Sequence, residues 1–273
     1  MPEPTTITSP ANPRVKALAA LRRRRTRDEQ GRTLVEGHEE LDLALRAGVV
    51  PETLYVCPEL MGDRARSSDV VDRAARLGAE VVRLSRPAFE KAAYREGPDG
   101  FLAVVPTVDR RCADLDLPDD PLVLVCQSVE KPGNLGAMLR TADAAGVSAV
   151  VAADPVTDWR NPNTVRASKG TVFAVPVASD GTATTLAWLR AHGIPLVAAT
   201  PDTRTEHTQV DWTGPVAVAV GTEKEGLTRE LLDAADHRVR IPMVGRADSL
   251  NVSTSAAILL YEAVRQRRGR AGS

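Results

Sequence analysis

The second half of the chain contains a series of short, continuous apolar runs with helical segments between them. Such runs cover residues 122–126, 148–151, 196–199 and 216–220, and a shorter one covers residues 238–241. This pattern is typical of strands that are buried on both faces of a parallel sheet. The alternation with helices therefore predicts an α/β domain with a mostly parallel sheet over residues 122–268.

A second alternation of strand-like and helix-like segments precedes this region. It covers about the first hundred residues and is typical of a small α/β domain. Residues 106–121 are polar and rich in aspartate, as expected of an interdomain linker. We therefore predict an N-terminal domain over residues 1–105, a linker over 106–121 and a C-terminal domain over 122–268.

The positive charge is concentrated near the N-terminus. The whole chain has 35 Lys and Arg residues against 36 Asp and Glu. Residues 1–35, in contrast, carry eight basic and three acidic side chains. Clustered arginines can bind phosphate oxygens, so Arg22, Arg23, Arg24 and Arg25 are candidates for contact with phosphate groups. The alternative is a solvated helix face that happens to be basic.

Cysteine content and hydropathy narrow the class of protein further. Cys57, Cys112 and Cys126 are odd in number and scattered, which fits neither a disulfide framework nor a zinc site. No apolar run has the length of a membrane span, and no signal peptide is visible. We expect a cytoplasmic protein without a metal or a membrane partner.

Ligands of open parallel sheets bind beyond the C-terminal ends of the strands. The run at 122–126 leads into a turn and a helix that carries Asn134 and Arg140. The run at 216–220 leads into Gly221-Thr-Glu-Lys-Glu-Gly226. Neither segment is a dinucleotide fingerprint or a P-loop.

Residues 239–262 have the same order of a short apolar run, a loop and a helix. A short strand stops at Pro242, a polar loop covers residues 245–250, and Asn251 is a good N-cap for the helix that follows. A loop that leads into a helix N-terminus offers free N–H groups to a polar ligand. On the pattern alone, a terminal helix that merely docks on the sheet is the simpler interpretation of the stretch.

These segments occur in the order of the motifs of a known family. Gly133-Asn-Leu-Gly-Ala-Met-Leu-Arg-Thr-Ala142 resembles the first motif of the SpoU/TrmH methyltransferases, the ribose 2′-O-methylating branch of the SPOUT superfamily. Gly221 to Gly226 resembles the second motif, and Ile-Pro-Met243 with Ser249-Leu-Asn-Val-Ser253 resembles the third. Arg166-Ala-Ser-Lys-Gly170 resembles an RNA-facing turn of the family. More loosely, Leu34-Val-Glu-Gly-His38 resembles the RNA-binding module that many members carry in front.

The resemblance implies a parallel sheet with a deep trefoil knot and S-adenosylmethionine held in the knot. It also implies transfer of a methyl group to a ribose 2′-hydroxyl of RNA, and a homodimer that buries the helix after Asn251. The extra N-terminal domain favours ribosomal RNA as the substrate.

The resemblance further implies roles for individual residues. The catalytic set would be Asn134, Arg140, Glu223, Ser249 and Asn251. The cofactor set would be Thr200, Gly221, Glu223, Ile241, Met243, Ser249, Leu250 and Asn251. Arg166 and Lys169 would join the arginines of residues 22–25 in binding RNA. Because a guanidinium stays protonated, we expect Arg140 to stabilise the developing alkoxide, and its role as the base is open.

Three questions stay open at this point. Methylation of transfer RNA and a non-catalytic, knotted RNA-binding protein are the alternative functions. Housekeeping modification and antibiotic self-resistance are equally compatible with the sequence. The target nucleotide is not specified by any motif.

Overall fold

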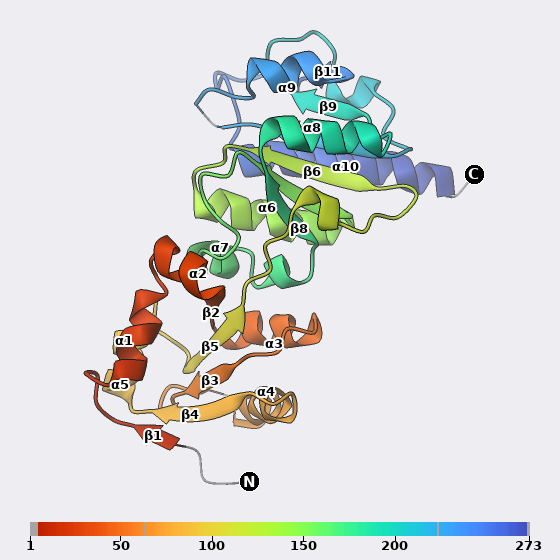
Figure 1. Ribbon diagram of the computed structural model, residues 1–273. Coiled ribbons are helices and arrows are strands. Elements are labelled where there is room, and N and C mark those ends of the chain that lie inside the picture. Colours follow the sequence, from red (N-terminus) through yellow and green to blue (C-terminus); the bar gives the residue numbers. More distant parts are fainter. Residues whose placement is uncertain (1–4, 63, 223, 272–273) are drawn as a thin grey trace. The chain divides into compact units, whose positions relative to one another are not determined.

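A computed structural model describes residues 5–62, 64–222 and 224–271 (Figure 1). The chain folds into two compact units. Unit 1 comprises Met1–Val108 and Trp159–Ala174, and unit 2 comprises Asp109–Asp158 and Val175–Ser273. The chain therefore leaves unit 2 after its second strand, contributes to unit 1 and then returns.

Unit 1 is built on a five-stranded mixed sheet with the strand order β1-β4-β3-β5-β2. The strands are β1 (Thr5–Ile7), β2 (Arg32–Glu36), β3 (Thr53–Val56), β4 (Glu80–Leu84) and β5 (Phe101–Pro106). β5 is antiparallel to both of its neighbours, whereas β1, β4 and β3 are mutually parallel. The predicted small α/β domain is therefore present.

The helices of unit 1 cover this sheet. They are α1 (Pro13–Ala20), α2 (Arg24–Gln30), α3 (His38–Arg46), α4 (Arg64–Arg76), α5 (Arg86–Ala92) and α7 (Pro162–Ala167). Val15 and Leu18 of α1 and Phe89 of α5 share one apolar core with side chains of β3 and β4. The helices α3 and α4 pack against each other. Burial of these apolar faces is the main stabilising contribution to such a layer.

The segment 159–174 is held in unit 1 by close backbone contacts. The Thr33 hydroxyl of β2 donates to the carbonyl of Arg160 at 2.5 Å. Gly170 has φ +85°, and a Cβ there would lie 2.9 Å from the carbonyl oxygen of Glu40. Only glycine fits this position without moving α3. The boundaries expected from sequence placed these residues in the C-terminal domain, because nothing local distinguishes them from an ordinary connection between strands.

Unit 2 contains a six-stranded sheet with the order β11-β9-β10-β6-β7-β8. The strands are β6 (Leu122–Gln127), β7 (Ala149–Ala153), β8 (Val177–Asp180), β9 (Leu196–Ala199), β10 (Val216–Val220) and β11 (His237–Val239). All of their pairings are parallel. This confirms the predicted parallel sheet, and every residue of β6, β7 and β10 is buried.

Helices lie on both faces of this sheet, as Figure 1 shows. They are α6 (Pro132–Ala145), α8 (Thr182–Ala191), α9 (Arg229–Ala234) and α10 (Val252–Ala271). Leu186 and Leu189 of α8 and Leu231 of α9 share one core with β6, β7 and β10. On the other face, α10 packs against α6 and β10.

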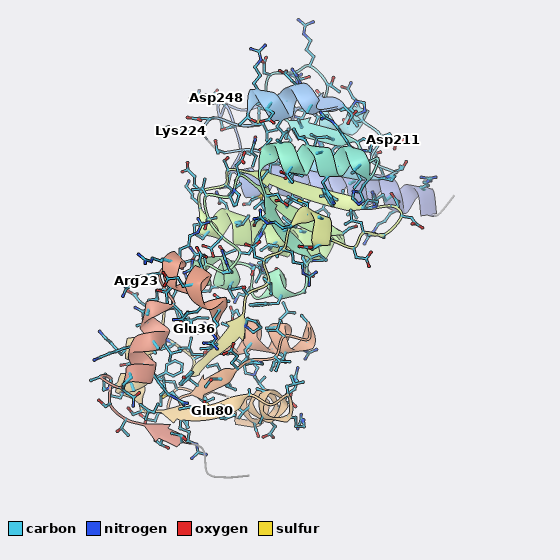
Figure 2. The ribbon with its side chains drawn as sticks, viewed as in Figure 1. Arg23, Glu36, Glu80, Asp211, Lys224 and Asp248 are labelled. Carbon is cyan, nitrogen blue, oxygen red and sulfur yellow. The ribbon has the colours of Figure 1, made fainter. Side chains whose placement is uncertain are left out.

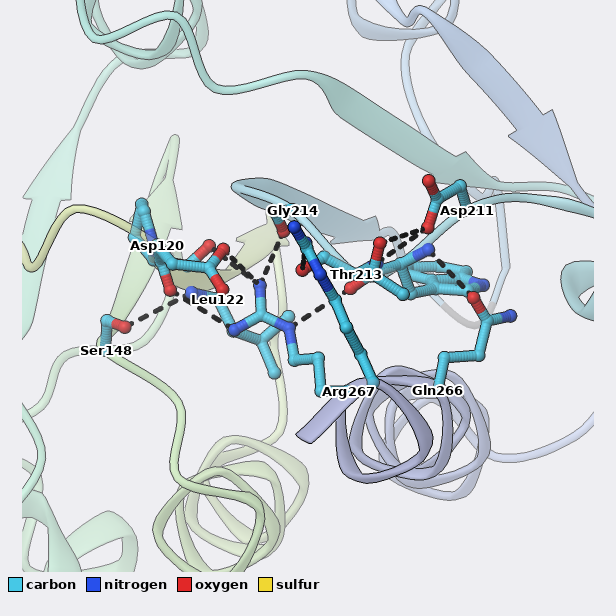
Figure 3. Close-up of polar contacts among 11 residues, drawn as sticks. Asp120, Leu122, Ser148, Asp211, Thr213, Gly214, Gln266 and Arg267 are labelled. Carbon is cyan, nitrogen blue, oxygen red and sulfur yellow. Dashed lines mark hydrogen bonds and ion pairs between the residues drawn. The ribbon is translucent and has the colours of Figure 1, made fainter. Parts of the chain in front are cut away.

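The second half of α10 fixes the segments that lead into two central strands (Figure 3). The guanidinium of Arg267 donates to the carbonyls of Trp212, Gly214 and Pro121. The Gln266 side chain accepts a hydrogen bond from the Trp212 N–H at 3.0 Å. The starts of β6 and β10 are thus tied to the helix whose N-terminus lies at the opposite ends of these strands.

Candidate active site

A pocket of about 470 Å³ opens beyond the C-terminal ends of β9, β10 and β11. Polar lining comes from Thr200, Thr222, Lys224, Glu225, Arg240, Asp248, Ser249 and Ser255, and apolar lining includes Val220, Leu227, Ile241, Met243, Leu250 and Val252. The volume suits a small organic cofactor. The pocket brings together the predicted cofactor residues Thr200, Gly221, Ile241, Met243, Ser249 and Leu250. Figure 2 shows Lys224 and Asp248 at this end of unit 2.

The loop after β10 requires both of its glycines. Thr222 and Gly226 exchange two backbone hydrogen bonds of 3.0 Å, which close a tight turn. A Cβ on Gly221 would lie 2.1 Å from the carbonyl oxygen of Gly226, and Gly226 itself has φ +70°. The two glycines of the predicted Gly-x-Glu-x-x-Gly motif are therefore a steric requirement of this turn. Its central residue, Glu223, lies outside the described residues.

A buried glutamine fixes the far end of the same loop. The Gln127 side chain accepts from the Thr228 N–H at 2.9 Å and donates to the Thr228 hydroxyl at 2.8 Å. It also donates to the Thr182 hydroxyl at 2.7 Å, at the start of α8. The sequence reasoning missed Gln127. The available signal was a polar residue that ends an apolar strand at the edge where ligands bind.

The Asn251 side chain connects the N-terminal turns of α6 and α10. Its Oδ1 accepts from the Ser253 N–H at 2.9 Å, so the predicted N-cap of α10 is confirmed. Its Nδ2 donates to Oδ1 of Asn134 at 3.2 Å. Two of the predicted catalytic residues, 117 positions apart in the sequence, are thus in direct contact.

A second pocket of about 370 Å³ lies beside Asn134. It is lined by Val129, Glu130, Lys131, Asn134, Thr222, Lys224 and Val252. Thr222, Lys224 and Val252 also line the first pocket. The two cavities therefore share a wall, and Asn134 stands beside that wall.

Arg140 lies away from both pockets. It follows Asn134 by six positions on α6, and at 100° per residue this places the two side chains on different sides of the helix. Arg140 is exposed, and it is not among the described residues that line either cavity. Within one chain, the structure does not bring it together with the rest of the predicted catalytic set.

The arginines predicted to bind RNA differ in their surroundings. Arg22 donates to the carbonyls of Ala92 and Ala93 at the end of α5, and its guanidinium lies over the Tyr94 ring at 5.9 Å from the centroid. Arg24 and Arg25 form ion pairs within α2, with Asp28 and Glu29 respectively. Arg23 is exposed at the surface of unit 1 (Figure 2).

The two basic residues of the predicted RNA-facing turn belong to unit 1. Arg166 is exposed, and the Lys169 ammonium lies 3.2 Å from the Glu39 carboxylate and 3.9 Å from that of Glu40. Glu40 is only 3% exposed, and burial raises the pKa of its carboxyl. Burial also raises the pKa of Glu36, although that carboxylate accepts backbone N–H bonds from Tyr94 and Arg95.

The described residues contain neither a cluster of metal ligands nor a helix that could span a membrane. Outside the undescribed positions, no group of three or more His, Cys, Asp or Glu side chains is placed to hold a metal ion. Within the same residues, none of the helices combines the length and the apolar character that crossing a membrane requires.

The fold and the pockets of unit 2 define a class. A parallel α/β sheet with a cofactor-sized pocket at its strand ends, and a second cavity adjoining it, is the arrangement of a cofactor-dependent enzyme. The chain belongs to the SpoU rRNA methylase family, whose model matches residues 121–261. A model of the MRM3-like substrate binding domain matches residues 12–103.

Individual relatives agree over nearly the whole chain. The 23S rRNA (guanosine(2553)-2′-O)-methyltransferase of Bacillus subtilis is 31% identical over 256 residues, which cover 93% of this chain and 97% of that protein. A solved RNA 2′-O ribose methyltransferase is 41% identical, with a TM-score of 0.84 over 97% of this chain and all of the other. An rRNA methyltransferase from Sinorhizobium meliloti, solved with AdoMet bound, is 31% identical, with a TM-score of 0.87 over 96% of this chain and 97% of that one.

Family membership confirms the predicted resemblance and fold class, and the deep trefoil knot is part of the SpoU fold. The course of the chain after β11 agrees with that fold. Arg240 exchanges backbone hydrogen bonds with Thr205 and His207 in the loop after β9. The chain then leads from the sheet edge to α10, which packs against the central strand β10.

Proposed function

We propose that the protein transfers a methyl group from S-adenosylmethionine to a ribose 2′-hydroxyl of ribosomal RNA. The observation that carries the proposal is the pair of adjoining cavities, with the bonded side chains of Asn134 and Asn251 where they meet. One cavity has the size of a cofactor, and the other adjoins it, where an acceptor ribose could bind.

Relatives support ribosomal RNA as the substrate. The Bacillus subtilis protein is named for a guanosine of 23S rRNA, and a 32% identical protein of Streptomyces viridochromogenes is named for a uridine of 23S rRNA. The match of the N-terminal unit to a substrate-binding domain supports recognition of a folded RNA. An enzyme of ribosomal RNA would act in the cytoplasm.

The first pocket suits S-adenosylmethionine. Val220, Ile241 and Leu250 offer apolar surface to the adenine, while the hydroxyls of Thr200 and Ser249 and the backbone of the turn at Gly221 offer polar contacts. When bound, the cofactor supplies a methyl group on a sulfonium, which is the electrophile of the reaction.

The residues of the chain position the acceptor and stabilise charge. Asn134, held by Asn251, would orient the ribose at the shared wall. Negative charge develops on the 2′-oxygen as its proton leaves, and a guanidinium beside it lowers the barrier without acting as a base. We assign that role to Arg140, and we place Glu223 and Ser249 among the polar groups that complete the site.

Arg140 lines neither cavity of its own chain, so a site on a partner subunit is the simplest place for it to perform this role. We therefore propose a homodimer formed by the C-terminal domains, in which Arg140 of one protomer completes the site of its partner. The exposed position of Arg140 on α6 and the half-exposed Tyr261 on α10 support this interface.

Two measurements test the proposal. Titration calorimetry with S-adenosylmethionine should show saturable binding, and its absence would identify a non-catalytic RNA-binding protein. Mapping of 2′-O-methylation on total RNA, with and without the protein, should reveal a new site in large-subunit ribosomal RNA. A site found only in transfer RNA would contradict the ribosomal assignment.

A further inference from the structure

The second pocket is lined by two lysines and lies beside the proposed cofactor pocket, so it is available to a different, negatively charged ligand. Its basic residues, among those described, are Lys131 from the loop after β6 and Lys224 from the loop after β10. These strands are parallel neighbours, so both loops emerge at the same edge of the sheet. Lys131 lines only the second pocket, whereas Lys224 lines both cavities.

The remaining lining suits a nucleoside. Val129 and Val252 provide apolar surface, and Asn134 and Thr222 provide hydrogen-bonding groups. At about 370 Å³ the cavity is within the size range of ligand pockets. The carboxylate of Glu130 only accepts hydrogen bonds, so it suits the N–H groups of a base edge and repels a phosphate.

We propose that this pocket receives the target nucleotide of the RNA, and that Lys131 and Lys224 bind the phosphates on either side of it. Two ammonium groups on separate loops can neutralise two phosphates of an extended strand, because Lys binds phosphate as a compact point charge. A nucleotide extruded into the pocket would have its ribose beside the shared wall, next to the cofactor.

This inference rests on the proposed function and adds the residues that hold the substrate at the site. Arg140 lines neither cavity within one chain, so the lysines are the positive groups that each protomer itself brings to its pocket. They belong to unit 2, whereas the arginines of residues 22–25 belong to unit 1.

The test uses the full-length protein and an unmodified 23S rRNA transcript. Filter binding over a series of salt concentrations gives the number of phosphates neutralised. The double variant Lys131→Ala/Lys224→Ala should lower the slope of log affinity against log salt by about 1.4, since each phosphate of a single strand contributes about 0.7. The KM for RNA should rise by roughly tenfold.

The single variants separate substrate binding from cofactor binding. Lys131→Ala should keep the wild-type affinity for S-adenosylmethionine, which also shows that it is folded, and should lose about 0.7 of the salt slope. Lys131→Arg should restore the slope. Arg229→Ala removes one exposed charge of α9 in the same unit and should leave KM unchanged.

An unchanged salt slope and RNA KM in Lys131→Ala and in the double variant would overturn the inference. The proposed function would survive that result if the wild-type protein still binds the cofactor and methylates RNA. A wild-type protein that binds neither S-adenosylmethionine nor RNA would refute the proposed function and this inference together.

Discussion

The Nδ2 group of Asn251 lies 3.2 Å from Oδ1 of Asn134 and donates a hydrogen bond to it. The same Asn251 side chain caps α10 through its Oδ1, which accepts from the Ser253 N–H at 2.9 Å and from the Ser253 hydroxyl at 2.6 Å. One amide therefore uses its oxygen to begin a helix and its nitrogen to orient a residue of another helix. This arrangement couples the stability of α10 to the geometry of the site.

Two substitutions at Asn251 separate these roles. Asn251→Asp keeps the oxygen that caps α10 but places a carboxylate against the Asn134 oxygen, so we expect turnover to fall with little loss of stability. Asn251→Ala removes both contacts and should cost about 1 kcal/mol of stability as well. Thermal unfolding and single-turnover methylation measure the two effects. Full turnover in Asn251→Asp would show that the contact with Asn134 has no role in catalysis.

Much of this site could be predicted from the sequence because its residues follow local rules. Asn251 has the side chain of an N-cap, and its position before an Ala-rich helix is a local signal. The glycines at 221 and 226 delimit a turn, and the structure shows a steric reason for each. The apolar runs located β6, β7, β9 and β10, because burial on both faces leaves no alternation, and the shorter run located β11. The sequence reasoning missed β8, which ends in the polar residues Ser179 and Asp180.

The remaining features depend on contacts between distant segments. Nothing near Gly170 indicates that the Glu40 backbone approaches it. Arg22 and Arg23 are adjacent and chemically identical, yet only Arg22 reaches the end of α5. The partners of Gln127 lie 55 and 101 positions away. Such pairings follow from the packed fold and have no local signature.

Gln127 should affect cofactor binding without touching the cofactor. Gln127→Leu leaves the Thr228 N–H without its partner and releases the end of the loop that lines the first pocket. We expect a stability loss of about 1–3 kcal/mol and a several-fold weaker affinity for S-adenosylmethionine. Thr182→Val is the control, because it removes the Gln127 contact with α8, together with the hydrogen bond from the Thr182 hydroxyl to Asp154, and leaves the loop attached. If Gln127→Leu and Thr182→Val bind S-adenosylmethionine with equal affinity, Gln127 does not position the loop that lines the first pocket.

The pH dependence of unit 1 should depend on Glu40. Burial raises the pKa of its carboxyl above the ordinary value of 4.5, so the folded state favours the protonated form. Its stabilising contribution is therefore present below pH 4.5 and is lost as the pH rises through the folded pKa. Glu40→Gln cannot ionise, so the stability of its unit 1 should vary less between pH 5 and pH 8.

Hydrogen exchange of peptides from β2 and α3, measured in urea at several pH values, reports this local stability. Glu39→Gln is the control. It removes the exposed partner of Lys169 and should change stability by less than about 1 kcal/mol. A Glu40→Gln protein that is less stable than wild type at pH 8 would mean that attraction to Lys169 outweighs the cost of burial.

Arg22 and Arg23 should have opposite phenotypes. Arg22→Ala removes donors from the carbonyls at the end of α5 and should destabilise unit 1 by about 1 kcal/mol. Arg23→Ala should leave stability unchanged and lower the salt slope of RNA binding by about 0.7, if the exposed guanidinium binds one phosphate. Thermal unfolding and filter binding distinguish the two. An unchanged slope in Arg23→Ala would show that this arginine is only solvated.

The position of Arg140 predicts that each active site is shared between two protomers. Arg140→Ala and Asn134→Ala should each abolish methyl transfer, and Arg140→Ala should still bind S-adenosylmethionine with wild-type affinity. Arg140→Lys should also fail, because an ammonium cannot contact the 2′-oxygen and a phosphate together as a planar fork can. Light scattering should show a homodimer at micromolar concentration.

Mixing the two inactive variants, after denaturation and joint refolding, tests the shared site directly. In a heterodimer whose sites combine Asn134 of one protomer with Arg140 of the other, one site carries both substitutions and its counterpart is intact. Random assortment makes half of the dimers heterodimers, so the mixture should recover about a quarter of the wild-type activity. Refolded single variants provide the baseline. If the mixture stays inactive although heterodimers form, Arg140 acts within its own chain, and α6 must then move to bring it to the pocket.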